Sequence, residues 1–217
     1  MPFERFEKIC QVLADPAFYP HPVSCLERRD THISAVFLTG DWVYKLKKPV
    51  DFGFLNFQSL EARKTFCGQE VSLNQRLSRG IYQGVVEIRL QQDGRFTLEG
   101  AGEVVEYAVK MVQLPEGASL RSLLTLRQIE TRDLKRLGYH LASFYERSAR
   151  TAEIDHFGDP EVIAFNMEEN FRQLEPFVGD WVPAEKWEFI RQVSRAFFEH
   201  RQQLFKRRVE TNRIKDG

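Results

Sequence analysis

The pattern of hydrophobic and polar residues divides the chain into a strand-rich first half and a helix-rich second half. Two segments of strand composition, Ile33–Leu38 and Trp42–Lys47, are joined by Thr39-Gly40-Asp41, which is typical of a tight hairpin. Asp93-Gly94 marks a second hairpin further along the chain. The expected strands cover residues 23–27, 33–38, 42–47, 85–90, 95–98 and 104–114, and the first of them is weakly patterned.

Helical spacing of apolar residues predicts helices at residues 3–13 and about 59–78, and only helices are expected beyond Gly117. Asp159-Pro160 opens one of these, because Asp suits a helix cap and Pro suits the first turn. We therefore predict an α+β protein, with a small antiparallel sheet, one inserted helix and then a helical half. The later helices are expected at residues 120–126, around 134–144, from 160, and from about 183 to beyond 207.

One acidic residue interrupts the apolar side of the helix expected at residues 59–78. At about 100° per residue, this stripe contains Phe66, Glu70, Leu73 and Leu77. An unpaired carboxylate buried there would cost several kcal/mol, so Glu70 needs a cation. Lys45, on the strand that precedes the helix, is the obvious candidate.

Composition narrows the class of protein. The 31 basic and 31 acidic residues give zero net charge, so there is no global signal for nucleic-acid binding. Cys10, Cys25 and Cys67 are odd in number and widely spaced, which fits a reducing environment better than a disulfide framework. The sequence has no apolar run of membrane-spanning length and no signal-peptide pattern. We expect a cytoplasmic protein without nucleic-acid or membrane partners.

Three segments carry a family resemblance. They are THISAVFLTGD with VYKLKKPVDFGFL in residues 31–55, CGQEVSLNQRL in residues 67–77, and YAVKMVQLPEG in residues 107–117. Together they resemble the bacterial aminoglycoside phosphotransferase-like proteins, a branch of the protein-kinase-like fold. The resemblance covers essentially the whole chain. It implies a sheet-plus-helix lobe in residues 1–114 and a helical lobe in residues 115–217 that lacks its catalytic-loop portion.

The resemblance assigns Lys45 to the phosphate-gripping lysine of the family and Glu70 to its partner on the helix. Val43 lies two residues before Lys45, hence on the same strand face, where it could roof an adenine ring. The alternative for Lys45 is a solvent-facing lysine on an amphipathic strand. Lys47 shares the same face and takes its place if the register differs.

Two further parts of a nucleotide site follow from the same resemblance. The phosphate loop is expected at residues 28–32, where no glycine occurs, and Thr31, His32 and Ser34 would offer donors. A polar turn with His32 packed against the sheet is the alternative. The link between the lobes is expected at residues 111–114. Gln113 and Leu114 would bind the adenine edge through their main chains, and Met111 would stand behind the pocket, unless this segment is only an edge strand and a proline turn.

The parts of a kinase that perform catalysis are not found. Asp51-Phe52-Gly53 spells the magnesium-binding triplet of kinases but precedes the Glu70 helix, so we interpret it as a turn. None of the five histidines is followed by Gly-Asp, the sequence that carries the catalytic aspartate in this family. ATP with Mg²⁺ is therefore expected for a longer parent protein, whose catalytic and metal-binding loops are outside this chain.

The sequence thus predicts the nucleotide-binding front half of an ATP-dependent phosphotransferase that acts on a hydroxyl of a small molecule. This fragment is expected to be inactive by itself, and whether it belongs to an enzyme is left open. The alternative is a pseudokinase or protein-interaction module without phosphotransfer. A third hypothesis is a purely structural helical domain with a β cap.

Overall fold

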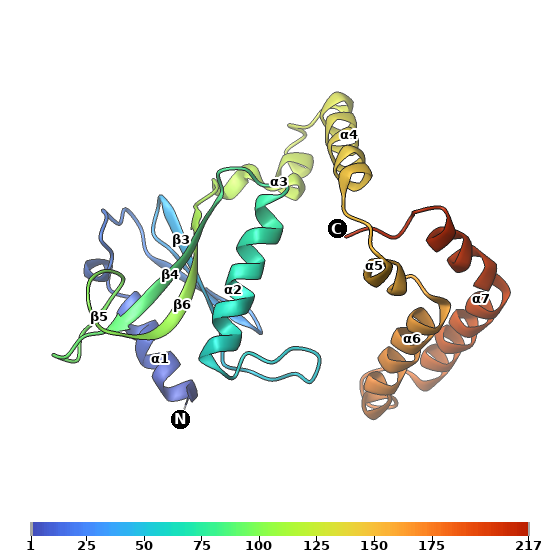
Figure 1. The fold of residues 1–217 in the computed structure, drawn as a ribbon, viewed down its shortest axis with the longest axis horizontal. Helices are drawn as coiled ribbons and strands as arrows, with labels where there is room; N and C mark the ends of the chain where they lie inside the picture. The colour runs from blue at the N-terminus through green and yellow to red at the C-terminus, as the bar shows by residue number, and fades with distance from the viewer. Residues whose placement is uncertain (1, 217) are drawn as a thin grey trace. The chain divides into compact units, whose positions relative to one another are not determined.

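A curled antiparallel sheet with one helix on each face forms the first part of the chain (Figure 1). The structure is a computed structural model that describes residues 2–216, and the chain divides after Gln128 into two compact units. The sheet has six strands in the order β1-β2-β3-β6-β4-β5. They are β1 (Glu27–Asp30), β2 (Ser34–Leu38), β3 (Trp42–Lys47), β4 (Tyr82–Leu90), β5 (Phe96–Thr97) and β6 (Glu103–Val112).

The two faces of the sheet have different partners because side chains alternate along each strand. Helix α1 (Pro2–Leu13) packs on one face, where Tyr44 and Leu46 of β3 belong to an apolar core. Helix α2 (Leu60–Gln75) covers the other face, where its Cys67 contacts the buried residues of β6. The first unit ends with the short helix α3 (Leu120–Thr125).

Helix α2 is rotated relative to the stripe that hydropathy predicts. Its buried residues are Arg63, Cys67 and Val71, whereas Leu73 and Leu77 are 53% and 42% exposed. The predicted apolar stripe is therefore wrong in its last two turns. The prediction failed because the buried side of the helix includes Arg63, and a hydropathy pattern treats an arginine as solvent-facing.

The first strand also differs from the prediction, because β1 begins where the expected strand at residues 23–27 ends. All four residues of β1 are exposed and charged, so they give no hydrophobic alternation to read. The strand is instead specified by pairing with β2, with Arg29 opposite Val36, and by ion pairs such as that between Arg28 and Asp30. The loop expected at residues 28–32 is consequently shorter, and Arg28 to Asp30 belong to the strand.

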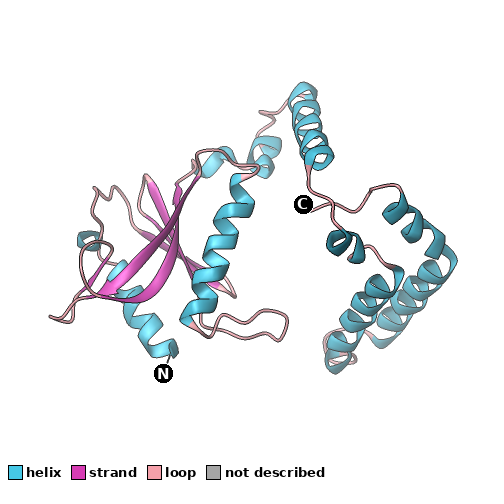
Figure 2. Cartoon of the chain, in the orientation of Figure 1, coloured by secondary structure: helices cyan, strands magenta, loops and turns pink. Residues whose placement is uncertain are grey.

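The second unit consists of helices in the described residues (Figure 2). Helix α6 begins at Pro160, as predicted, and packs against α7 through Phe171 and Trp187, whose rings meet edge to face. Glu168 of α6 binds Arg195 of α7 at 2.5 Å. The helices are α4 (Thr131–Arg147), α5 (Ala152–His156), α6 (Pro160–Leu174) and α7 (Ala184–Glu210).

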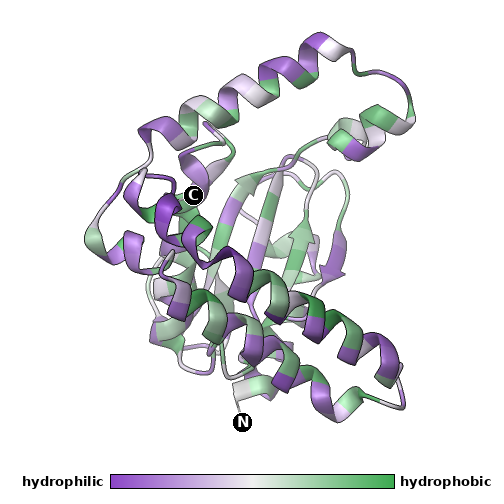
Figure 3. Cartoon of the chain, turned by 90° about the vertical axis from the view of Figure 1, so that its right-hand side faces the viewer, coloured by the Kyte–Doolittle hydropathy of each residue, from purple (hydrophilic) through white to green (hydrophobic). Residues whose placement is uncertain are grey.

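Hydrophobic and hydrophilic residues recur along these helices (Figure 3), and many of the large apolar side chains are exposed. On α4 the exposed stripe contains Leu134, Leu137, Leu141 and Tyr145. Residues 115–128 belong to the first compact unit, although the family resemblance places them in the helical lobe. None of the described helices is long and apolar enough to cross a membrane.

The core between α1 and the sheet should dominate the stability of the first unit. We expect Leu46→Ala to lower the free energy of opening by about 2–5 kcal/mol, because Leu46 is completely buried and truncation leaves a cavity. Hydrogen exchange of the amides of β2, β3 and β6 measures this change. Leu126→Ala is the matched control, since that side chain is exposed, and it should change the same quantity by less than about 0.5 kcal/mol. Equal effects of the two substitutions would contradict the assigned core.

Candidate functional site

Two lysines of β3 bind one glutamate of α2. The Nζ atom of Lys45 donates to Oε1 of Glu70 at 2.7 Å, and the Nζ atom of Lys47 donates to Oε2 at 2.8 Å. The side chains of Lys45, Lys47 and Glu70 are 29%, 7% and 12% exposed. The predicted contact between Lys45 and Glu70 is confirmed, and Lys47, which was expected only as a replacement, binds the same carboxylate.

The strand geometry explains why both lysines reach Glu70. Residues two apart on a strand project from the same face, so Lys45 and Lys47 both face α2. The register places Lys45 between Val36 of β2 and Val109 of β6, in the middle of the sheet. The alternative of a solvent-facing Lys45 is therefore wrong in its geometry, because the side chain is turned to the helix and ion-paired.

The cluster contains one more positive charge than negative charge. Burial opposes ionisation of Glu70 and is the largest single influence on it, but the hydrogen bonds and charges of Lys45 and Lys47 together outweigh burial. The pKa of Glu70 consequently lies below its ordinary value. Nζ of Lys47 also lies 5.0 Å from the centroid of the Phe57 ring, a cation–π contact. Lys45 is the more accessible of the two ammonium groups.

Apolar side chains lie next to Lys45 on the same face of the sheet. Val43 is buried and stands opposite Met111 of β6 in the β3–β6 register. Met111 is partly buried and packs with the α2 core, and Tyr82 of β4 is its other cross-strand neighbour. The structure thus places Val43, Lys45 and Met111 on the face of the sheet that α2 covers, where Glu70 binds Lys45.

The residues of the expected phosphate loop are arranged less uniformly. Ser34 is buried opposite Lys47, and its Oγ atom has no hydrogen-bond partner within the described part of the chain. Thr31 accepts a hydrogen bond from the Ser34 amide at 3.0 Å, so its hydroxyl closes the turn. His32 is exposed, and so it does not pack against the sheet. Lys48 fixes the turn by donating to the Thr31 carbonyl at 2.8 Å.

In the segment expected to link the lobes, residues 111–114, Gln113 already forms hydrogen bonds within the protein. The main-chain amide of Gln113 donates to the Asp41 carbonyl at 2.8 Å, and its side-chain Oε1 accepts from the Gly40 amide at 2.9 Å. Gln113 therefore clasps the β2–β3 hairpin, in which Gly40 has a φ of 104° that favours glycine. Leu114 follows the end of β6 and is largely exposed.

A second charged pair, which joins α2 to β6, was not predicted from the sequence. Arg63 Nε donates to Glu106 Oε1 at 2.8 Å, and both side chains are buried. Arg63 also donates to the carbonyls of Phe57 and Gln58. Burial raises the pKa of Glu106 in spite of the Arg63 guanidinium beside it. A glutamate inside the apolar strand segment 104–109 was the available signal, and it resembles the signal used for Glu70.

The Asp51-Phe52-Gly53 triplet forms a turn, as predicted. Oδ1 of Asp51 accepts from the Gly53 amide at 2.8 Å, and Oδ2 accepts from Asn56 Nδ2 at 2.7 Å. Gly53 has a φ of 79°, which explains the glycine. Within residues 2–216, no group of three or more His, Cys, Asp or Glu side chains is placed to hold a metal ion.

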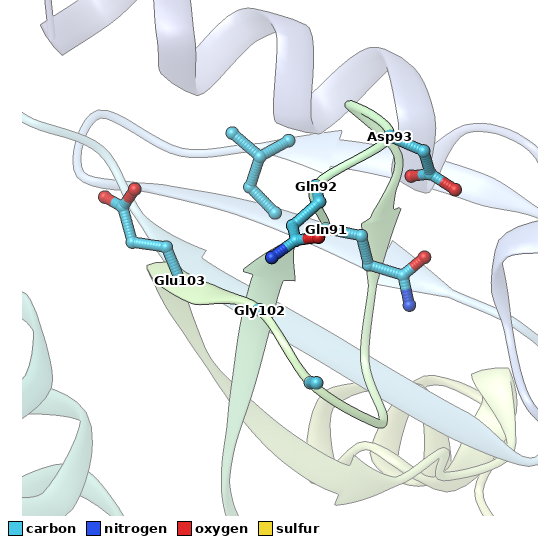
Figure 4. A pocket seen from close by; sticks show the side chains of 7 residues that line it. Gln91, Gln92, Asp93, Gly102 and Glu103 are labelled. Atoms are coloured by element: carbon cyan, nitrogen blue, oxygen red, sulfur yellow. The ribbon is translucent and has the colours of Figure 1, made fainter.

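An open concavity lies on the sheet away from this cluster (Figure 4). It is formed by the β4–β5 turn and the start of β6, and Figure 4 shows Gln91 and Asp93 extending to one side and Glu103 to the other. Val85 of β4 and Lys45 of β3 both pair with Val109 of the intervening β6. The concavity at Leu90 is five residues, or roughly 17 Å, further along β4 from Val85. Its polar groups do not converge on one point, and it is a weaker candidate than the lysine–glutamate cluster.

Comparison with known proteins finds relatives without an assigned function. Uncharacterized proteins of Mycobacterium tuberculosis and Mycobacterium bovis are each 28% identical to the chain over 200 residues. The matched segment is 91% of this chain and 38% of each relative, so the chain spans well under half the length of the curated proteins it matches. No protein-family model matches the chain, and no solved structure matches it.

Neutralising Glu70 should weaken the first unit and change its response to acid. At pH 7 we expect Glu70→Gln to lower the free energy of unfolding by about 2–3 kcal/mol, less than the ~3–5 kcal/mol typical of a fully buried pair because Lys45 reaches solvent. The folded-state pKa of Glu70 is below its ordinary value of 4.5. Its stabilising effect is therefore complete above pH 4.5 and is lost as the pH falls through the folded-state pKa.

Urea denaturation of both proteins between pH 3 and pH 7 measures this dependence, in the range set by ordinary carboxyl pKa values of about 4. The difference between wild type and Glu70→Gln should be constant at the upper end and shrink at the lower end. A difference that grows on acidification would contradict the assigned charge state of Glu70.

Breaking the Arg63–Glu106 pair should be more damaging than removing an exposed pair. We expect Arg63→Met to lower the free energy of unfolding by about 3–5 kcal/mol, because it leaves the Glu106 carboxylate buried without its cation. Arg95→Met is the matched control, since Arg95 and its partner Asp93 are both largely exposed. Its free energy of unfolding should be nearly that of wild type, because solvent screens an exposed pair. Urea denaturation at pH 7 compares the two, and similar small effects would exclude a structural role for the buried pair.

Proposed function

We propose that the first unit binds a nucleotide, with Lys45 positioning its phosphates and Glu70 holding Lys45. The observation that carries the proposal is the unbalanced cluster itself, in which two ammonium groups share one carboxylate and the more accessible ammonium belongs to Lys45. A half-buried excess positive charge is complementary to a polyphosphate. The order of elements, with a helix between the third and fourth strands, supports a kinase-like fold for this unit.

The neighbouring residues suit the parts of ATP to different degrees. The unpartnered Ser34 hydroxyl would add a donor near the phosphates, and Val43 with Met111 offers an apolar surface for adenine. The main-chain amide of Gln113 is bound to Asp41 and would have to be released to contact the adenine edge. Leu114, which is largely exposed, is the better candidate for a main-chain contact with adenine. The described residues contain no cluster of three or more side chains that could bind Mg²⁺, so the proposal includes no metal ligand from this part of the chain.

The larger protein implied by this site would be an aminoglycoside phosphotransferase-like kinase. It would transfer a phosphoryl group from ATP to a hydroxyl of a small molecule, and the groups that orient the acceptor would come from outside this chain. The longer mycobacterial relatives leave room for such a part, since the matched segment is 38% of their length. The residues of this chain would contribute binding and orientation of the phosphates.

A pseudokinase or protein-interaction module is the second candidate. The observation that favours it is the exposed apolar stripe of α4, which contains Leu134, Leu137 and Leu141. Large exposed apolar patches mark interaction sites in many proteins. Nucleotide binding without any associated transferase in the natural protein would favour this candidate over a kinase.

The nucleotide proposal is tested by ATP binding to the full chain. We expect Lys45→Met to weaken binding by about 10–100-fold, which corresponds to the loss of one charge-assisted hydrogen bond. Isothermal titration calorimetry at low ionic strength gives the dissociation constants. Lys64→Met is the matched control, because Lys64 is an exposed lysine on α2 that does not contact Glu70, and its affinity should equal that of wild type. A wild-type chain that fails to bind millimolar ATP would overturn the proposal.

A further inference from the structure

If Lys45 binds a ligand, it has to interact with two anions, the ligand and the Glu70 carboxylate. If Lys45 turns from Glu70 toward an anion, the carboxylate loses one of its hydrogen bonds while it remains 12% exposed. An uncompensated charge in such a place is strongly unfavourable. In a site with a single lysine, one ammonium group would have to donate to both the ligand and the carboxylate. This chain has a second ammonium on the other carboxylate oxygen.

Lys45 and Lys47 have surroundings that suit different roles. Lys47 is almost fully enclosed, with its Nζ atom near the Phe57 ring and its strand position opposite the buried Ser34. Lys45 retains access to solvent. An anion arriving from solvent thus meets the ammonium of Lys45 first, while Lys47 is held against Glu70.

We propose that Lys47 is a positioning residue that keeps the Glu70 carboxylate charged and in place when Lys45 engages the phosphates of a nucleotide. The inference rests on the proposed function for the identity of the ligand. The exchange involves only hydrogen bonds and ion pairs. Lys45 moves from sharing Glu70 to holding phosphate, Lys47 continues to donate to Glu70, and no proton needs to be taken up.

Other titratable groups near Glu70 do not replace Lys47. Cys67 on α2 and Tyr82 on β4 are electrostatically coupled to Glu70, and burial raises the pKa of both, to about 11 for Cys67. Both are therefore neutral in the acidic range in which Glu70 titrates. Glu106 of β6 is bound by Arg63 and supplies no cation. Lys45 and Lys47 are the positive groups that act on Glu70 from the sheet.

The first experiment needs no nucleotide. Lys45→Met imitates the state in which Lys45 has left Glu70, and the Glu70 side-chain carboxyl is followed by carbon NMR against pH, with Glu70→Gln identifying its signal. We expect the pKa of Glu70 to be clearly lower in Lys45→Met than in the double variant Lys45→Met/Lys47→Met, because Lys47 still donates to the carboxylate in the single variant. Equal Glu70 pKa values in the single and double variants would overturn the role of Lys47, whether or not the chain binds ATP.

The second experiment uses ATP at about pH 5.5, above the ordinary carboxyl range, in buffers of different ionisation enthalpy. Wild type sets the baseline, because the terminal phosphate of ATP, with a second pKa of about 6, also exchanges protons on binding at this pH. The proton uptake by each variant is therefore compared with that of wild type. Lys47→Met should bind about tenfold more weakly and take up more protons than wild type, because Glu70 is then left without a cation and protonates. A Lys47 that only supports the fold would lower the melting temperature without this additional proton uptake, and that result would overturn the proposal.

A double-mutant cycle separates positioning from direct contact with the ligand. If Lys47 acts through Glu70, Lys47→Met should have little further effect on ATP affinity in a Glu70→Gln background. An undiminished loss in that background would show that Lys47 touches phosphate itself and would overturn the proposal. Lys64→Met serves as the exposed control throughout. Failure of the wild type to bind ATP would remove the nucleotide but leave the NMR result as a separate test of Lys47.

Discussion

The carboxylate of Glu70 is held out of water between a helix and a sheet, and this requires cations at defined places. Lys45 and Lys47 supply them because an extended strand presents residues two apart on one face. The requirement acts in both directions, since two enclosed or half-enclosed ammonium groups also need an anion. Helix α2 packs on β4 and β6, and Glu70 ties it in addition to β3, while the apolar contacts of Cys67 and Val71 with β6 complete the packing.

Charge attaches α2 to the sheet at two positions, Arg63 and Glu70. Arg63 and Glu70 are seven residues apart, which is two helical turns or about 10 Å along the helix. Arg63 binds Glu106 of β6, and Glu70 binds β3, so the helix is oriented against two central strands. Directional hydrogen bonds at two points restrict the rotation of a helix about its axis and its shift along the axis more than non-directional apolar contacts do. The placement of α2 therefore also sets the position of the Glu70 carboxylate in the site.

Sequence reasoning succeeded where one residue's chemistry implied a partner and failed where burial was carried by charged side chains. The isolated acid at position 70 correctly predicted the contact with Lys45, and Asp159-Pro160 correctly predicted the start of α6. The rotation of α2 was missed because Arg63 is buried by pairing, a fact that depends on a residue far along the chain. The charged strand β1 was misplaced for a related reason, since pairing with β2 specifies it. His32 and the bound amide of Gln113 depend on turn and hairpin contacts that no periodicity reveals.

The two charged clusters that α2 forms with the sheet differ in a way that bears on function. Arg63 and Glu106 form a pair of equal and opposite charges, and the guanidinium is completed by the carbonyls of Phe57 and Gln58. Such a pair is internally satisfied and needs no further partner. The Lys45–Glu70–Lys47 cluster carries an excess positive charge and leaves one ammonium accessible to solvent. A purely structural role is met by the first arrangement, whereas the second keeps an accessible ammonium group that an anion from solvent could bind. That difference between neighbouring clusters on one helix supports a ligand site at Lys45 and a structural role at Arg63.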